Sequence, residues 1–206
     1  MTPRIWRPDE AWLAPLLAAL AADGLALVPT ETVYGVVARV DRPAGVAALY
    51  AAKGRPAGQP LQVLVGSPAA GRALAREWPP SARALADRWW PGPLTLVVPA
   101  ADALPAEVRA ADGSVGLRCP DHELARELLA AAGPLAASSA NRAGEPPANT
   151  CAEAVAALGE AVAAALDDGP VRGGVPSSVV RIARGGWELL RAGALTTALI
   201  EATLDG

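Results

Sequence analysis

The chain has 206 residues and a hydrophobic content of 52%, so it can bury one sizeable core, and we expect a single domain over residues 1–206. Its net charge of −3 and pI near 5.2 argue against a surface that attracts nucleic acid as a whole. No apolar run approaches the ~20 residues of a membrane span, and the polar N-terminus lacks the apolar stretch of a signal peptide. Cys119 and Cys151 form no disulfide framework, which favours a reducing, cytoplasmic location.

The predicted elements alternate between helices and strands in chain order. Apolar residues at helical spacing predict a helix from Trp12 that ends near Gly24, where glycine can take the left-handed cap conformation. A buried strand at 25–29, an extended segment at 33–40 and a helix at 44–52 follow. Further strands are predicted at 61–65, 94–99, 114–118, 134–138, 161–166 and 177–183, and further helices before Trp89, at 123–132 and at 151–158. This alternation predicts an α/β sheet with helices packed on it.

Polar residues collect in glycine- and proline-bounded loops beside these strands. The loops are PTETVYG at 29–35, KGRPAGQP at 53–60, SVGLRCP at 114–120, SSANRAG at 138–144 and PSSVV at 176–180. Ligands of open α/β sheets bind in the crevice outside the strand ends, so we expect several of these loops to converge on one small-molecule pocket. The alternative is that they are ordinary polar surface loops.

Lys53 is the only lysine of the chain, although arginine is used throughout. A lone lysine among arginines suggests a position that needs a compact ammonium, and the alternative is chance. Lys53 and Arg55 are predicted at a helix-to-loop junction, where an extended backbone would point both cations the same way and let them clamp an anion. Ser139 and Asn141 would add neutral hydrogen-bonding groups after a buried strand. A surface charge pair and an ordinary turn are the plainer interpretations.

Several other kinds of site are poorly supported. The lone lysine lacks the glycine spacing of a phosphate-binding P-loop. Cys119 and His122 have the spacing of half a zinc site without a second pair, and one histidine without a G-x-S-x-G turn argues against a hydrolase. An aromatic content of 4% argues against base-stacking platforms. Chemistry that depends on positioning and charge fits best.

In their order and spacing, the loops resemble the YrdC-like family of threonylcarbamoyl-AMP synthases, the standalone TsaC type. The resemblance runs from about Ile5 to Leu195. Its pieces are PTETVYG at 29–35, KGRP at 53–56, PL-x-V at 60–63, WPGPLTLV from Trp90, SVGLR-x-P at 114–120, SSAN-x-x-G at 138–144, PSSVV at 176–180 and LLRAG ending at Gly193. The resemblance implies a single-domain twisted mixed parallel/antiparallel sheet with flanking helices and a deep basic cleft.

The same matching implies the roles of individual residues. The family signature falls on four residues expected at the catalytic centre: Lys53, Arg55, Ser139 and Asn141. The implied ATP contacts are these four with Ser114 and Arg191. The implied threonine contacts are Thr32, Arg118, Ser177 and the backbone near Ala137. No metal ligands are expected in the protein.

The implied reaction joins L-threonine, bicarbonate or CO2 and ATP into threonylcarbamoyl-AMP with release of pyrophosphate. Mg2+ would accompany the ATP phosphates, and fixed cations would stabilise the approach of two anions. The product would pass to a complex that transfers the threonylcarbamoyl group to tRNA, and weak binding of tRNA to this chain is part of the expectation. No membrane partner is expected.

The chain departs from the family pattern where relatives often carry histidine, since Gln59 and Leu64 stand there. Leu64 cannot hydrogen-bond a substrate, so we expect the amino-acid pocket to differ near it. Ser114 and Ser178 replace threonines and keep the hydroxyl. Two alternative functions are a non-catalytic RNA-binding module of the same fold and a carbamoyl-adenylate enzyme with another acceptor.

Overall fold

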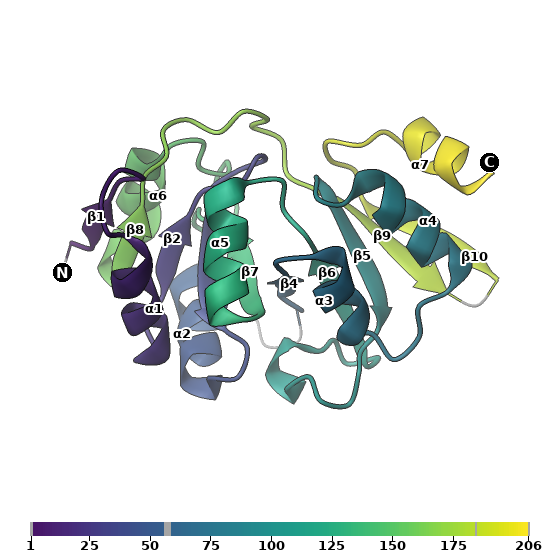
Figure 1. The fold of residues 1–206 in the computed structure, drawn as a ribbon, viewed down its shortest axis with the longest axis horizontal. Coiled ribbons are helices and arrows are strands. Elements are labelled where there is room, and N and C mark those ends of the chain that lie inside the picture. The colour runs from purple at the N-terminus through teal and green to yellow at the C-terminus, as the bar shows by residue number, and fades with distance from the viewer. Residues whose placement is uncertain (1, 56–58, 184, 206) are drawn as a thin grey trace.

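The computed structural model describes residues 2–55, 59–183 and 185–205, and Pro56 of the KGRP motif lies outside them. One mixed sheet of ten strands runs through the described chain in the order β1-β8-β2-β3-β7-β4-β6-β5-β9-β10 (Figure 1). The strands are β1 Arg4–Trp6, β2 Ala26–Val28, β3 Gly35–Arg39, β4 Gln62–Leu64, β5 Leu94–Pro99, β6 Ser114–Arg118, β7 Leu135–Ser139, β8 Ala164–Leu166, β9 Ser178–Ala183 and β10 Gly186–Arg191. The sheet contains parallel pairs such as β4 with β6 and antiparallel pairs such as β3 with β7, which confirms the expected mixed sheet.

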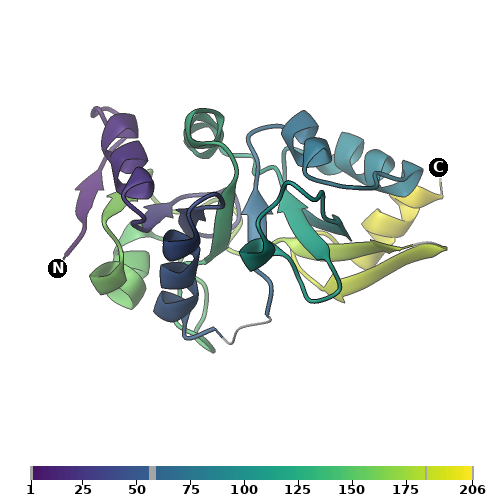
Figure 2. The ribbon, with the colours of Figure 1, turned by 90° about the horizontal axis from the view of Figure 1, so that it is seen from below.

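Helices cover both faces of this sheet, with α1, α5 and α4 on one side and α2 and α6 on the other (Figure 2). The helices are α1 Leu13–Ala21, α2 Pro43–Lys53, α3 Pro68–Ala73, α4 Pro80–Trp89, α5 Glu123–Ala132, α6 Cys151–Leu158 and α7 Thr197–Leu204. Helix α2 ends where Gly54 takes the left-handed conformation, at φ 56° and ψ 31°. A glycine cap suits this position because a left-handed residue with a Cβ is strained.

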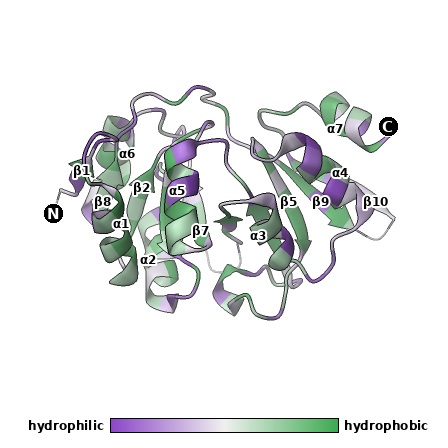
Figure 3. Cartoon of the chain, viewed as in Figure 1, coloured by the Kyte–Doolittle hydropathy of each residue, from purple (hydrophilic) through white to green (hydrophobic). Residues whose placement is uncertain are grey.

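The strand sequences divide their side chains between two hydrophobic clusters. In β2, Leu27 belongs to one cluster while Ala26 and Val28 belong to the other. In β4, Val63 and Leu64 divide in the same way. Because successive side chains of a strand point to opposite faces, continuous apolar segments bury both faces of the central sheet. Figure 3 shows β2, β5 and β9 coloured mainly as hydrophobic, as this arrangement requires.

The sequence-based elements are confirmed in most of the chain and wrong mainly at its periphery. The predicted left-handed cap at Gly24 is also wrong, because α1 ends at Ala21 and Asp23 takes the left-handed conformation, at φ 62°. The alanine-rich stretch before Trp89 forms two helices, α3 and α4, each with proline in its first turn. Strand β1, strand β10 and helix α7 were not predicted. Strand β10 is mostly exposed and pairs only with β9 among the described strands, so its sequence carries little of the apolar pattern of a buried strand.

In the part of the chain that the structure describes, no helix combines the length and apolar character needed to cross a membrane.

Candidate functional site

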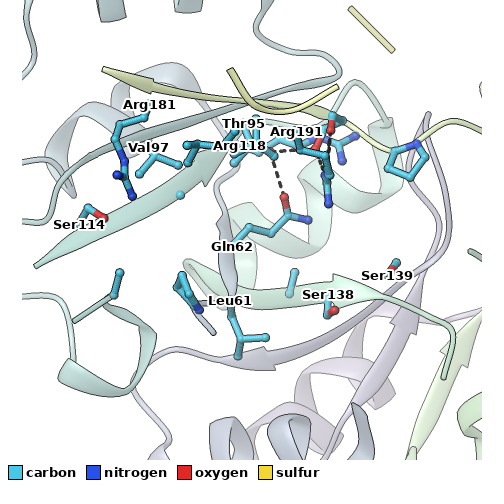
Figure 4. Close-up of a pocket in the computed structure, with 18 of the residues that line it drawn as sticks. Leu61, Gln62, Thr95, Val97, Ser114, Arg118, Ser138, Ser139, Arg181 and Arg191 are labelled. Atoms are coloured by element: carbon cyan, nitrogen blue, oxygen red, sulfur yellow. Dashed lines mark hydrogen bonds between the residues drawn. The ribbon is translucent and has the colours of Figure 1, made fainter. Parts of the chain in front are cut away.

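A cavity of about 320 Å³ lies against β4, β5, β6, β9 and β10 (Figure 4). Seven of the ten predicted site residues line it: Arg55, Ser114, Arg118, Ala137, Ser139, Ser177 and Arg191. The expected convergence of separate loops is therefore confirmed. The site was predicted in loops outside the strand ends. This prediction is partly wrong, because residues within the strands themselves form much of the cavity wall.

Gly116 in the middle of β6 is one of the residues that open this strand face. It lines the cavity, and a Cβ added there would lie 3.2 Å from Cγ2 of Thr95 on the neighbouring strand. A side chain at this position would therefore crowd Thr95 and occupy space that a ligand could use. Glycine at position 116 therefore leaves this part of the cavity open.

The wall carries four arginines, Arg55, Arg118, Arg181 and Arg191, and no acidic side chain among its described residues. The pKa of Arg191 is lowered, first by burial and then by the positive charges of Arg118 and Arg55. Arg191 thus lies close enough to the other two guanidinium groups to be repelled by them, and an anion bound beside it would relieve that repulsion. Arg55 itself donates to the carbonyl oxygens of Gln59 and Pro60, at 3.0 and 2.9 Å.

Arg181 was missed by the sequence analysis. It lies two residues beyond Val179 on β9, and both line the cavity. Strand alternation places such residues on one face, so this spacing was the available signal. Arg181 also contacts Asp112 at 3.3 Å, and Asp112 accepts a hydrogen bond of 2.6 Å from the hydroxyl of Ser114. These contacts link Arg181 to the predicted nucleotide contact Ser114.

Arg118 enters the cavity from the end of β6 and is only 2% exposed. Its Nη2 donates to Oγ1 of Thr32 at 2.8 Å, and its Nε donates to the carbonyl oxygen of Gly92 at 3.2 Å. Thr32 does not line the cavity, so the structure connects this predicted threonine contact to the site through Arg118. A rigid planar donor is thereby available for a carboxylate or a phosphate.

A chain of polar side chains crosses the cavity floor. Arg191 donates through Nη2 to Oγ of Ser177 at 3.1 Å, and Oγ of Ser177 lies 2.9 Å from Oγ1 of Thr95. Thr95 donates to Oε1 of Gln62 at 3.1 Å, as the dashed contact in Figure 4 shows. Thr95 and Gln62 were missed by the sequence analysis because each lies inside an apolar strand pattern.

Lys53 and Asn141 lie beside the cavity and do not form its wall. The predicted extended backbone between Lys53 and Arg55 is wrong, because Lys53 ends α2 and Gly54 is left-handed. The Lys53 side chain is turned into the protein, where its Nζ donates to the carbonyl oxygens of Ser139 and Asn141. Lys53 therefore supports the loop that carries Ser139, and Arg55 alone of this pair lines the cavity.

Leu64 departs from the family pattern, but the structure places this residue outside the described cavity wall. Its side chain is 2% exposed and packs in the cluster that contains Val37 and Ala137. The expected change in the amino-acid pocket at Leu64 is not supported by this placement. Gln59 contributes its carbonyl oxygen to the contact with Arg55.

The described part of the chain contains no group of three or more His, Cys, Asp or Glu side chains that could hold a metal ion. Both cysteines are free and buried, and burial raises the pKa of each thiol to about 11. The cavity instead offers arginine cations, hydroxyl groups and an amide. The fold and this cavity define an α/β protein suited to binding a small anionic molecule.

The chain belongs to the Sua5/YciO/YrdC family, whose family model, described as "Telomere recombination", matches residues 18–193. It is 42% identical over 96% of its length to a putative threonylcarbamoyl-AMP synthase of Mycobacterium leprae, of which it covers 90%. It is 38% identical over 95% of its length to the threonylcarbamoyl-AMP synthase of Bacillus subtilis, of which it covers 57%.

Solved structures agree with this family. The P. abyssi Sua5 structure complexed with L-threonine aligns with a TM-score of 0.92 and 33% identity over 99% of this chain. The chain spans 61% of that relative. The E. coli YciO structure aligns over 97% of this chain with a TM-score of 0.84 and 17% identity, which supports the fold alone.

Proposed function

We propose that the chain is a threonylcarbamoyl-AMP synthase, a nucleotidyltransferase that forms threonylcarbamoyl-AMP and pyrophosphate from L-threonine, bicarbonate or CO2 and ATP. The observation that carries the proposal is the convergence of seven predicted substrate contacts on one arginine-lined cavity. The names of relatives that match over most of this chain point to the same activity.

In the proposed arrangement, ATP lies toward Arg55, Ser114, Ser139 and Arg191. Arg55 and Arg191 supply guanidinium forks for phosphate oxygens, and the two serines supply hydroxyl groups. Lys53 and Asn141 act mainly by holding the loop of Ser139, in keeping with their contacts. In this proposal, the arginines and serines touch ATP, and Lys53 and Asn141 position the serine loop.

Threonine in this arrangement lies toward Arg118, Ser177 and the backbone near Ala137. The guanidinium of Arg118 pairs with the carboxylate of threonine, and Thr32 fixes that guanidinium. This part of the proposal rests on the depth of Arg118 in the cavity and on the L-threonine named for the P. abyssi relative.

The reaction needs no covalent nucleophile from the protein. The amine nitrogen of threonine attacks CO2 to give a carbamate and loses a proton. A carbamate oxygen then attacks the α-phosphorus of ATP, and pyrophosphate leaves. Carbamate and triphosphate are both anionic, so the arginines of the wall lower the barrier by holding them together and offsetting their charge.

Mg2+ enters this scheme as a partner of the ATP phosphates. No carboxylate stands among the described residues of the cavity wall, so this part of the wall does not offer the acidic ligands of a resident magnesium site. Mg2+ bound to ATP would reduce the charge that the arginines must offset.

The proposal extends to the fate of the product. Threonylcarbamoyl-AMP is a mixed anhydride, so we propose that a separate complex accepts it and transfers the threonylcarbamoyl group to tRNA. Weak tRNA binding and a cytoplasmic location belong to the same proposal, and the free, buried thiols of Cys119 and Cys151 suit a reducing compartment.

The test is pyrophosphate release from ATP with threonine and bicarbonate each present or omitted. The proposal predicts release only when both are present, and a loss of about 100-fold or more in Arg191→Ala. Arg83→Ala, which removes an exposed arginine of α4, is the matched control and should keep wild-type turnover. Pyrophosphate release that does not depend on threonine would contradict the proposal. Tight tRNA binding without turnover of ATP would also contradict it.

A further inference from the structure

Arg118 is a buried cation that needs a compensating charge. Its side chain is 3% exposed, and its hydrogen bonds to Thr32 and Gly92 use uncharged oxygens. Arg191 lies close enough for the positive charge of Arg118 to lower its pKa. A guanidinium removed from water and placed beside other cations is costly unless an anion offsets it.

That anion is Glu31, whose Oε1 lies 2.8 Å from Nη2 of Arg118. The Glu31 side chain is 16% exposed, and each of its carboxylate oxygens has less than 1 Å² accessible to solvent. Neither oxygen has a hydrogen-bond partner among the described residues, so the ion pair with Arg118 is the contact that compensates the buried carboxylate. The two charges therefore depend on each other.

The backbone around Glu31 is fixed independently of this ion pair. The amide of Gly173 donates to the carbonyl oxygen of Glu31 at 2.9 Å, and the amide of Gly174 donates to that of Thr32 at 2.8 Å. A Cβ at Gly173 would lie 2.8 Å from the Glu31 carbonyl oxygen, so this close approach needs glycine. Thr30 closes the turn by donating to the carbonyl oxygen of Val33 at 2.6 Å.

We propose that Glu31 is a positioning residue that holds the Arg118 guanidinium in the orientation that receives the carboxylate of the amino-acid substrate. The inference rests on the proposed function for the identity of that substrate. Glu31 does not line the cavity, and its carboxylate oxygens are closed to solvent, so it acts through Arg118 and does not touch substrate. Thr32 and Glu31 contact the same nitrogen of Arg118 and together fix its rotation.

The test compares Glu31→Gln, which keeps the shape and removes the charge, with Glu31→Asp, which keeps a shorter carboxylate. The control is Asp121→Asn, because Asp121 is an exposed acid that lines the same neighbouring polar pocket as Glu31. Each purified full-length variant is measured for KM of threonine, KM of ATP, Tm and the mobility of the Arg118 side-chain Nε–H group by NMR.

The expected result for Glu31→Gln is a more mobile Arg118 and a threonine KM raised on the order of tenfold. This is the lower end of the about 10- to 100-fold that the hydrogen-bonding partners of metal-ligating side chains contribute in the analogous positioning role. The ATP KM should stay within about twofold, the size of an ordinary surface substitution. Glu31→Asp should fall between wild type and Glu31→Gln, and Asp121→Asn should match wild type.

Two results would overturn the inference: an Arg118 group as rigid in Glu31→Gln as in wild type, or equal rises in both KM values with a lower Tm. The second result is what a merely structural residue produces. Failure of the proposed function gives a different result from failure of this inference: the wild-type protein itself would then release no pyrophosphate in response to threonine. In that case the NMR comparison still decides whether Glu31 holds Arg118.

Discussion

Lys53 donates to both oxygens of Asn141, to its backbone carbonyl and, at 3.2 Å, to its side-chain Oδ1. A third contact, 2.7 Å long, joins its Nζ to the carbonyl oxygen of Ser139. The Asn141 amide in turn donates to the carbonyl oxygens of Arg142 and Glu145. The only lysine of the chain therefore ties the end of α2 to the loop after β7, with three acceptors around one ammonium.

Replacing Lys53 should impair both activity and stability. Lys53→Met removes the donor of the Asn141 carbonyl oxygen and one of the donors to the Ser139 carbonyl oxygen. This loss costs about 1–3 kcal/mol of unfolding free energy, and the displaced Ser139 loop should lower kcat/KM about 100-fold or more. Lys53→Arg should also be poor, because a planar fork cannot match three acceptors around a point charge. Denaturant unfolding and pyrophosphate release measure the two effects.

Arg142→Met is the control for Lys53, since Arg142 is exposed beside the same loop and carries the same charge. It should keep activity within about twofold. Wild-type activity in both Lys53 variants would show that Lys53 has no role in the reaction beyond an ordinary structural one.

Activity should decline above about pH 8. Burial, more than the nearby charge of Arg55, lowers the pKa of Lys53 from 10.5 to about 8. The ammonium that binds Asn141 and Ser139 is therefore lost as pH rises through about 8, and kcat/KM for ATP should fall with that apparent pKa. Lys53→Arg, which stays charged, should show low activity without this decline.

The effect of Lys53 on stability should have the opposite sign. Between about pH 8 and 10.5 the folded protein binds fewer protons at Lys53 than the unfolded chain does. Its contribution to the free energy of unfolding therefore rises with pH across this window. Unfolding curves of wild type and Lys53→Met, compared at several pH values, should diverge in that direction, and parallel curves would contradict the lowered pKa.

The sequence predicted the central sheet because its strands are apolar on both faces, as Val63 and Leu64 illustrate. The exposed edge strand β10 has no such pattern and escaped prediction. The family resemblance predicted seven residues that line the cavity and three that do not, namely Thr32, Lys53 and Asn141. It missed Arg181, Thr95 and Gln62, which the register of the paired strands brings to the cavity. The backbone between Lys53 and Arg55 is not extended, because Lys53 ends α2 and Gly54 is left-handed, and the local sequence pattern did not predict this.

Ser177 should contribute more to threonine binding than its neighbour Thr95. Ser177→Ala removes the hydroxyl acceptor of Arg191 and a proposed substrate contact, while the backbone carbonyl of Ser177 still accepts from Arg191. KM for threonine should therefore rise about 10- to 100-fold, the equivalent of ~1.5–3 kcal/mol for a hydrogen bond to a charged group. Thr95→Val keeps the volume and removes one neutral link, so its effect should be smaller. Steady-state kinetics decide, and a larger effect at Thr95 would contradict the proposed placement of threonine.

Filling the cavity floor should weaken binding. Gly116→Val adds a side chain whose Cβ would lie 3.2 Å from Cγ2 of Thr95 and 3.8 Å from Cγ2 of Val97, both of which line the cavity. Overpacking costs about 1–3 kcal/mol of stability, and titration calorimetry should show weaker binding of both ATP and threonine. Unchanged affinity for both ligands would place the substrate site elsewhere.

The most direct test of the central claim is mass spectrometry of the product formed from ATP, threonine and isotope-labelled bicarbonate. The proposed reaction yields threonylcarbamoyl-AMP that carries the bicarbonate carbon, with one pyrophosphate released per molecule and no product from Arg118→Ala. Threonyl-AMP without that carbon, or labelled product from Arg118→Ala at the wild-type rate, would contradict it.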